Sequence, residues 1–203
     1  MHPKPRKILV VSATENEMLG TQYLGVEQLV SGVGMVATTF ALTKKLSEQK
    51  FDAVVNIGIA GSFQDIELGS VVQVVSDCLV ELGVEDNDVF VPADEIEICK
   101  RGDLAFVTGL RLPAVREAVG VTVNRVHGSS RSIAEMVAQF NPDVESMEGA
   151  AVGFVCKQFD VPWVQLRAIS NKVEPRNRET WNIPLAIRNL HLETEKFLSN
   201  LNQ

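Results

Sequence analysis

The stretch MVATTFALTKKLSEQKFDAVVNIGIAG, residues 35–61, decides the fold class. Its first part, 35–49, has apolar residues at helical spacing, among them Val36, Phe40 and Leu46. Its second part, 52–61, is a short β-branched run that ends in a glycine turn, which is typical of a buried strand. A helix followed at once by a buried strand indicates an α/β domain.

The same alternation extends to both sides of this stretch. Further strands are predicted at 7–14, 26–32, 70–80, 121–128 and 162–170, and further helices at 113–119, 132–140, 148–159 and 184–201. The acidic, turn-rich residues between them, 81–103, are expected to form an exposed excursion. The pattern predicts a three-layer α/β/α fold with a mixed, largely parallel central sheet. We expect residues 1–203 to form a single domain, because the length suits one α/β unit.

The bulk composition excludes several classes of protein. A net charge of −7 and a pI of about 5.0 disfavour a nucleic-acid partner, which usually requires a basic surface. No apolar run reaches membrane-spanning length, so no membrane partner is expected. Cys78, Cys99 and Cys156 are widely spaced and odd in number, which favours reduced thiols in the cytoplasm. We expect neither a metal ion nor a cofactor.

A glycine motif lies between the second strand and the next helix. SGVGMVA contains G-x-G-x-x-A at Gly32, Gly34 and Ala37. A dinucleotide site would also need an acidic residue at the end of the following strand, and that strand ends instead in GIAG. The motif therefore indicates either a close approach of the backbone to some other ligand or a purely structural turn.

Polar residues gather where the predicted strands end. Ligands bind at the carboxyl ends of parallel strands, so these residues are candidates for a site: Glu15, Glu17, Ser31, Asn56, His127, Glu145, Glu148, Ser170 and Asn171. Ordinary explanations compete with this one. A glutamate at a helix start favours the helix dipole, and a histidine at a strand end is often a satisfied structural residue. The run 174–178 is either a solvated loop or a source of Arg176 or Arg178 for a substrate carboxylate.

Three motifs carry a resemblance to a known family. NIGIAGSF (56–63), ESMEGAA (145–151) and LRAISN (166–171), in this order, resemble the nucleoside phosphorylase and nucleosidase superfamily. SATENEM (12–18) is similar to its hydrolase branch, which includes methylthioadenosine/S-adenosylhomocysteine nucleosidase. The ending SNKVEPRNRETWNI (170–183) most resembles the futalosine hydrolases, which release hypoxanthine from futalosine in menaquinone biosynthesis.

The resemblance implies a purine nucleoside phosphorylase-like fold, a nucleoside substrate such as futalosine, a homodimer or larger homo-oligomer, and a set of site residues. Glu17 matches the carboxylate that activates the attacking water. Asn171 falls at the catalytic position beside the purine. The remaining matched positions are expected to bind or support the substrate: Ile59, Met147, Glu148, Arg167, Ser170 and Arg176.

Asn171 departs from the pattern of the adenine-specific enzymes, which carry an aspartate there. An amide donates hydrogen bonds to O6 and N7 of a 6-oxopurine, whereas a carboxylate would repel both acceptors. The sequence therefore predicts a hypoxanthine or guanine nucleoside. Ser146 stands where those enzymes tend to be acidic, and the segment between Glu17 and Ser31 is too short for their extra hairpin.

Three alternatives stay open at this point. One is a methylthioadenosine/S-adenosylhomocysteine-type nucleosidase. Another is a phosphorylase, although the loop 31–38 has no arginine to bind phosphate. The third is an inert nucleoside-binding domain, which would have no use for Glu17.

Overall fold

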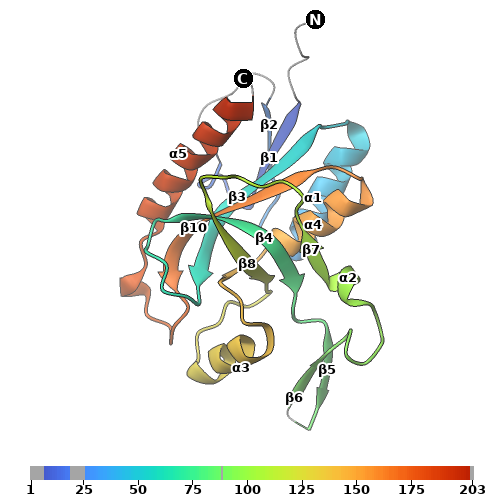
Figure 1. Cartoon of the computed structure of the whole chain (residues 1–203), viewed down its shortest axis with the longest axis vertical. Coiled ribbons are helices and arrows are strands. Elements are labelled where there is room, and N and C mark those ends of the chain that lie inside the picture. The colour runs from blue at the N-terminus through green and yellow to red at the C-terminus, as the bar shows by residue number, and fades with distance from the viewer. Residues whose placement is uncertain (1–6, 19–25, 88, 202–203) are drawn as a thin grey trace, which may run out of the picture.

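The computed structural model describes residues 7–18, 26–87 and 89–201. A mixed sheet lies in the middle and carries helices on two sides (Figure 1). α1 (Met35–Glu48) and α4 (Gly149–Gln158) contact each other beside one face, and α5 (Ile183–Leu201) packs on β10 and β3 from the other. This arrangement confirms the predicted three-layer α/β/α fold.

The sheet has eight strands. Their order is β10 (Trp163–Lys172), β4 (Val71–Leu79), β8 (Arg116–Thr122), β9 (Val144–Ser146), β3 (Ala53–Ser62), β1 (Ile8–Ser12) and β2 (Val26–Val30), with β7 (Ala105–Val107) paired to β4. β10 also pairs with β3, so five of the strands form a closed ring. β1, β2, β3 and β10 run parallel, while β4 and β9 run antiparallel to their neighbours β10 and β3. The carboxyl ends of the parallel strands therefore lie together.

Alternate side chains of β1 enter two different cores, as the twofold repeat of a strand requires. Ile8 and Val10 pack in the cluster that contains Leu190 of α5. Leu9 and Val11 pack with residues of α1 and α4 on the other face. Burial on both faces explains why this strand is apolar throughout.

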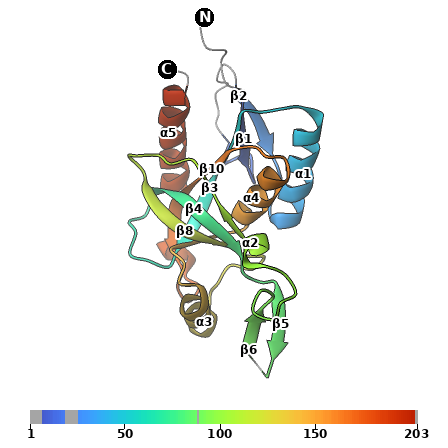
Figure 2. The ribbon, with the colours of Figure 1, turned by 45° about the vertical axis from the view of Figure 1, so that its right-hand side comes forward.

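The segment between β4 and β7 extends away from the sheet. It contains the hairpin β5 (Gly83–Asp86) and β6 (Val89–Pro92), then the short helix α2 (Arg101–Leu104). The hairpin projects beyond the rest of the fold (Figure 2), which agrees with the expected exposed excursion. The remaining elements are α3 (Ser130–Phe140) and the 3-10 turn η1 (Arg178–Thr180). None of the described helices is long and apolar enough to cross a membrane.

Three sequence expectations about local structure are wrong. Residues 113–119 are not a helix, because Arg116 already begins β8 and pairs with Val72 of β4. Tertiary pairing overrides a weak helical pattern there. The glycine turn expected at the end of 52–61 is instead a continuation of β3 to Ser62. The strand expected over 121–128 ends at Thr122, because β8 begins earlier, at Arg116.

Candidate active site

Glu17 lies just after β1 and is held by three hydrogen-bond donors. Its Oε2 accepts from the backbone N of Thr14 at 3.1 Å and from Thr14 Oγ1 at 2.9 Å. Its Oε1 accepts from the backbone N of Ile59 in β3 at 3.1 Å. The carboxylate is buried, so these donors replace the water that it loses. Ile59 therefore reaches the site through its main chain.

Glu148 is the N-cap residue of α4, but its side chain forms no capping hydrogen bond. Its Oε1 instead accepts from the backbone N of Gly34 at 2.9 Å. Gly34 has φ of 91°, a conformation that favours glycine, and this explains the glycine motif of residues 31–37. Burial raises the pKa of Glu148, and the charge of Arg167 and the Gly34 N–H act against that rise. The glycine loop thus approaches a carboxylate of the protein itself.

Arg167 interacts electrostatically with both of these carboxylates. It is only 1% exposed, and its Nη2 donates to Asn56 Oδ1 at 2.6 Å. Burial lowers the pKa of Arg167, while the negative charges of Glu148 and Glu17 favour its charged form. Nε has no partner within the described structure. A buried cation requires nearby compensating charge, so the three ionisable groups form one electrostatic unit.

Glycine makes room for this unit. A Cβ on Gly58 would lie 3.0 Å from Arg167 Nη1 and 3.2 Å from Glu17 Oε1. Gly58 pairs with Arg167 across the β3–β10 ladder. The glycines of 58–61 therefore permit close side-chain approach within a strand, where a turn was expected.

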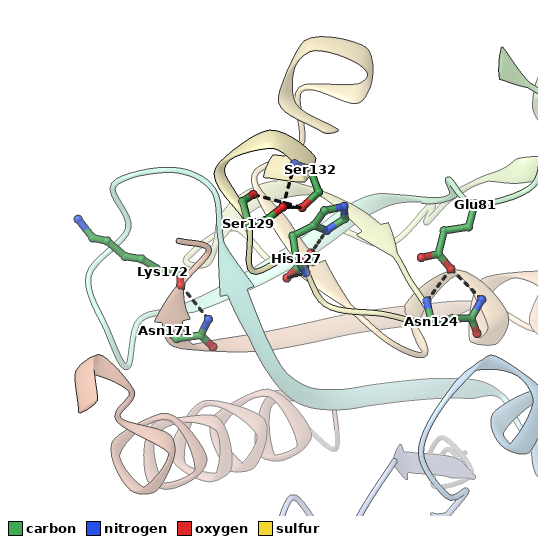
Figure 3. Close-up of polar contacts among 8 residues, drawn as sticks. Glu81, Asn124, His127, Ser129, Ser132, Asn171 and Lys172 are labelled. Carbon is green, nitrogen blue, oxygen red and sulfur yellow. Dashed lines mark hydrogen bonds and ion pairs between the residues drawn. The ribbon is translucent and has the colours of Figure 1, made fainter. Parts of the chain in front are cut away.

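A bulge in β10 sets the position of Asn171. The ladder pairs Ile169 with Ala60 and then Asn171 with Gly61, which leaves Ser170 as an extra residue. Bulges often redirect side chains beside functional sites. Ser170 Oγ donates to Asn171 Oδ1 at 2.8 Å. Asn171 Nδ2 donates to the carbonyl of Lys172 at 2.9 Å (Figure 3). These bonds fix the amide and use one of the two Nδ2 hydrogens.

The two groups of polar residues lie at different points along β3. Glu17 and Arg167 meet at Gly58, whereas Asn171 lies at Gly61. Three strand residues span about 10 Å, which is comparable with a ribose joined to a purine. The arrangement therefore presents carboxylates at one end and an amide at the other.

A cavity of about 50 Å³ adjoins Asn171. It is lined by Gly61, Val126, His127, Glu145, Asn171, Lys172, Glu174, Arg176 and Trp181. This volume is well below that of usual ligand pockets. Two larger cavities, of about 510 and 730 Å³, lie at the opposite ends of the strands and contain none of the predicted site residues.

Met147 and Arg176 complete the predicted set. Met147 is half-buried between β9 and Glu148. Arg176 is exposed, and its guanidinium carbon lies 5.4 Å from the centre of the Trp181 ring. It therefore lies at the Asn171 end of the site, away from Glu148.

Sequence reasoning missed a buried network below α4. Asp77 Oδ2 accepts from Gln165 Nε2 at 2.9 Å, and Asp77 Oδ1 accepts from Thr122 Oγ1 at 2.8 Å. Thr122 Oγ1 in turn accepts from the backbone N of Ala150 at 2.7 Å. Burial raises the pKa of Asp77. The network anchors the start of α4 and so the position of Glu148. The sequence does contain one sign of this network, because Asp77 lies inside the largely apolar run 70–80.

Gly149 provides a test of this packing. A Cβ at Gly149 would overlap Asp77 Oδ2 and Gln165 Nε2, both of which are buried. We expect Gly149→Ala to lower the free energy of unfolding by about 3 kcal/mol, since overpacking and a broken buried bond add up. Urea denaturation measures this. Gly102→Ala is the control, because no atom lies within 4 Å of its Cβ, and it should change stability by under about 0.5 kcal/mol. If Gly149→Ala were as stable as the wild-type protein, the buried network would be able to rearrange around the added methyl group at little cost.

Comparisons with known proteins agree with this geometry. The family model described as Phosphorylase superfamily matches residues 21–199. Futalosine hydrolase of Acidothermus cellulolyticus is 30% identical over 174 residues, which cover 80% of this chain and 70% of that protein. A 5'-methylthioadenosine/S-adenosylhomocysteine nucleosidase of Shewanella pealeana is also 30% identical, over 76% of this chain and 73% of that protein.

A solved structure gives the same fold. A futalosine hydrolase mutant of Helicobacter pylori superposes with a TM-score of 0.78 at 20% identity, over 96% of this chain and 99% of the other. At that identity the likeness supports the fold alone. The sequence matches confirm the resemblance that the motifs indicated, including the one to futalosine hydrolases. The family model spans most of the chain, and the chain therefore belongs to the phosphorylase superfamily.

Proposed function

We propose that this protein hydrolyses the N-glycosidic bond of a 6-oxopurine nucleoside. Its substrate is then futalosine, which yields hypoxanthine and dehypoxanthine futalosine in menaquinone biosynthesis. One observation carries the proposal: Glu17 and Glu148 both interact electrostatically with the buried Arg167, and a fixed amide, Asn171, lies further along β3. The similarity to curated futalosine hydrolase supports it.

The carboxylates divide the chemistry between them. Glu17 takes a proton from a water molecule aimed at the anomeric carbon. Glu148 accepts from the ribose hydroxyls, with Met147 beside it, and places negative charge near the cationic transition state. Preorganised contacts of this kind contribute a few kcal/mol each. The charge of Arg167 opposes the effect of burial, which raises the pKa of Glu148.

Asn171 supplies base recognition. The Nδ2 hydrogen that Lys172 leaves free donates to O6 or N7 of the base. Ser170 holds the carbonyl side of the amide away from those acceptors. This orientation favours hypoxanthine over adenine, because adenine presents an amine where hypoxanthine presents O6. Arg176 remains a candidate for the substrate carboxylate.

The loop 31–38 favours hydrolysis over phosphorolysis. Its Gly34 N–H, the kind of donor that a phosphate needs, already binds the Glu148 carboxylate. A phosphate at that place would meet a negative charge. A neutral water molecule at that place meets no such repulsion.

Release of free base from three nucleosides tests the proposal. The protein is incubated with futalosine, inosine and methylthioadenosine in phosphate-free buffer, and the bases are separated by chromatography. We expect hypoxanthine from futalosine without added phosphate. Preferred release of adenine would support the methylthioadenosine nucleosidase alternative, and dependence on phosphate would indicate a phosphorylase. No release from any substrate would indicate an inert binding domain.

We also propose a homo-oligomer in the cytoplasm. The start of α1, next to Gly34, exposes Val33, Val36 and Phe40, and a second copy of the chain would cover them. The three free cysteines support a reducing compartment.

A charge in this apolar patch tests the assembly. We expect Phe40→Glu to convert the oligomer into monomers, as measured by light scattering after gel filtration, because the substitution buries a charge at the contact. Leu192→Glu, on the exposed face of α5, is the control and should leave the mass unchanged. An unchanged mass for Phe40→Glu would remove this surface from the interface.

A further inference from the structure

A buried histidine–glutamate pair lies beside Asn171 and has no part in the mechanism above. Glu145 belongs to β9 and its side chain is 3% exposed. His127 follows β8, and its side chain is 12% exposed. His127 Nδ1 and Glu145 Oε2 are 2.6 Å apart, and the backbone N of His127 donates to Glu145 Oε1 at 3.1 Å.

These contacts fix the orientation of the imidazole. The carboxylate holds the ring through Nδ1, and Phe63 packs against it edge-on with ring centres 6.0 Å apart. Within the described residues, no group bonds to Nε2. A carboxylate on one ring nitrogen orients the other toward a reacting group and stabilises the charge of the imidazolium, as in catalytic triads.

The strand register brings this pair to the base end of the site. Gly61 pairs with Glu145 of β9 on one side and with Asn171 of β10 on the other. A Cβ on Gly61 would lie 3.1 Å from Asn171 Nδ2 and 3.6 Å from Glu145 Cγ. His127 and Asn171 line the same cavity, and Figure 3 shows both side chains. A base held by Asn171 would therefore lie beside the cavity that His127 also lines.

We propose that His127, held by Glu145, donates the proton to the departing purine. This inference rests on the proposed function. It identifies a general acid, a role that Asn171 does not fill, because an amide donates hydrogen bonds but does not give up a proton. Proton donation to a poor leaving group contributes about 10²–10⁴ in rate.

The step balances. The C1′–N bond breaks, and its electron pair moves into the purine ring. The Nε2 proton of the His127 imidazolium transfers to a ring nitrogen, so the base leaves neutral. Water forms the new C1′–O bond and gives its proton to Glu17. His127 then regains a proton from solvent, and Glu17 loses one to solvent.

Leaving-group dependence tests the inference. The nucleoside that the wild-type protein cleaves is compared with 4-nitrophenyl riboside, whose phenolate leaves without protonation. For His127→Gln we expect kcat on the nucleoside to fall about 10²-fold or more, with KM within about threefold. On the aryl riboside kcat should stay within about threefold. Glu145→Gln keeps a bond to the ring but loses the charge, so it should give a smaller loss with the same selectivity.

Several outcomes separate this inference from the proposed function. Glu17→Gln is the matched control and should lose activity on both substrates. If both pair variants lose the same factor on both substrates, or raise KM alone, His127 has only a structural role and the inference fails while the function stands. If the wild-type protein cleaves no nucleoside, the proposed function itself fails. Melting temperatures of both variants distinguish lost chemistry from lost folding.

Discussion

Replacing Glu17 with glutamine is expected to lower turnover about 10³-fold or more while substrate still binds. Glutamine has nearly the same shape, and its carbonyl oxygen still accepts from the Ile59 N–H, while its amide nitrogen no longer accepts from the Thr14 N–H. It does not take a proton from water, and loss of a positioned base reduces rates by about 10²–10⁴. Single-turnover rates measure the chemical step, and calorimetry with intact substrate measures binding.

The neighbouring glutamate offers a control for this substitution. Glu15 is exposed and lies in the same turn, so Glu15→Gln should leave both turnover and affinity unchanged. A Glu17→Gln variant with more than about a tenth of wild-type turnover would contradict the assignment. Weak binding combined with a normal chemical step would show that Glu17 positions substrate and does not activate water.

The sequence predicts the layers of the fold well where a pattern is local. The apolar runs 7–14 and 162–170 predict the buried strands β1 and β10, and 184–201 is a helix with Ala186 and Leu190 in the core. The prediction fails where partners far along the chain decide. β7 and β9 are three residues each and exist only through their pairing with β4 and β3.

The site follows the same division. Family motifs identify Glu17, Glu148 and Asn171 as candidates from the sequence. They do not reveal that Glu148 bonds to Gly34, because those residues are 114 positions apart. The partner of His127 was also hidden. Glu145 has the appearance of a helix-start glutamate in the sequence, but the β3–β9 ladder turns it toward the imidazole.

Replacing Asn171 with aspartate is expected to change base preference. The Ser170 hydroxyl still donates to Oδ1, so the carboxylate keeps the orientation of the amide. Its second oxygen then faces the Lys172 carbonyl and the O6 and N7 atoms of the base, all of which are acceptors. We expect kcat/KM for the hypoxanthine nucleoside to fall about 10²-fold or more, because buried acceptors are left without donors. The adenine nucleoside should lose far less, since its amine donates to the new oxygen.

Competition between the two nucleosides in one reaction measures this preference directly, because both are cleaved by the same amount of folded protein. Asn177→Asp is the control: the Asn177 side chain only accepts from the Glu179 N–H before η1, and aspartate accepts equally well. The ratio of hypoxanthine to adenine should therefore stay constant in Asn177→Asp and fall in Asn171→Asp. An unchanged ratio in Asn171→Asp would mean that the Asn171 side chain does not touch the base. A carboxylate in contact with the base would repel the O6 and N7 acceptors and so lower the ratio.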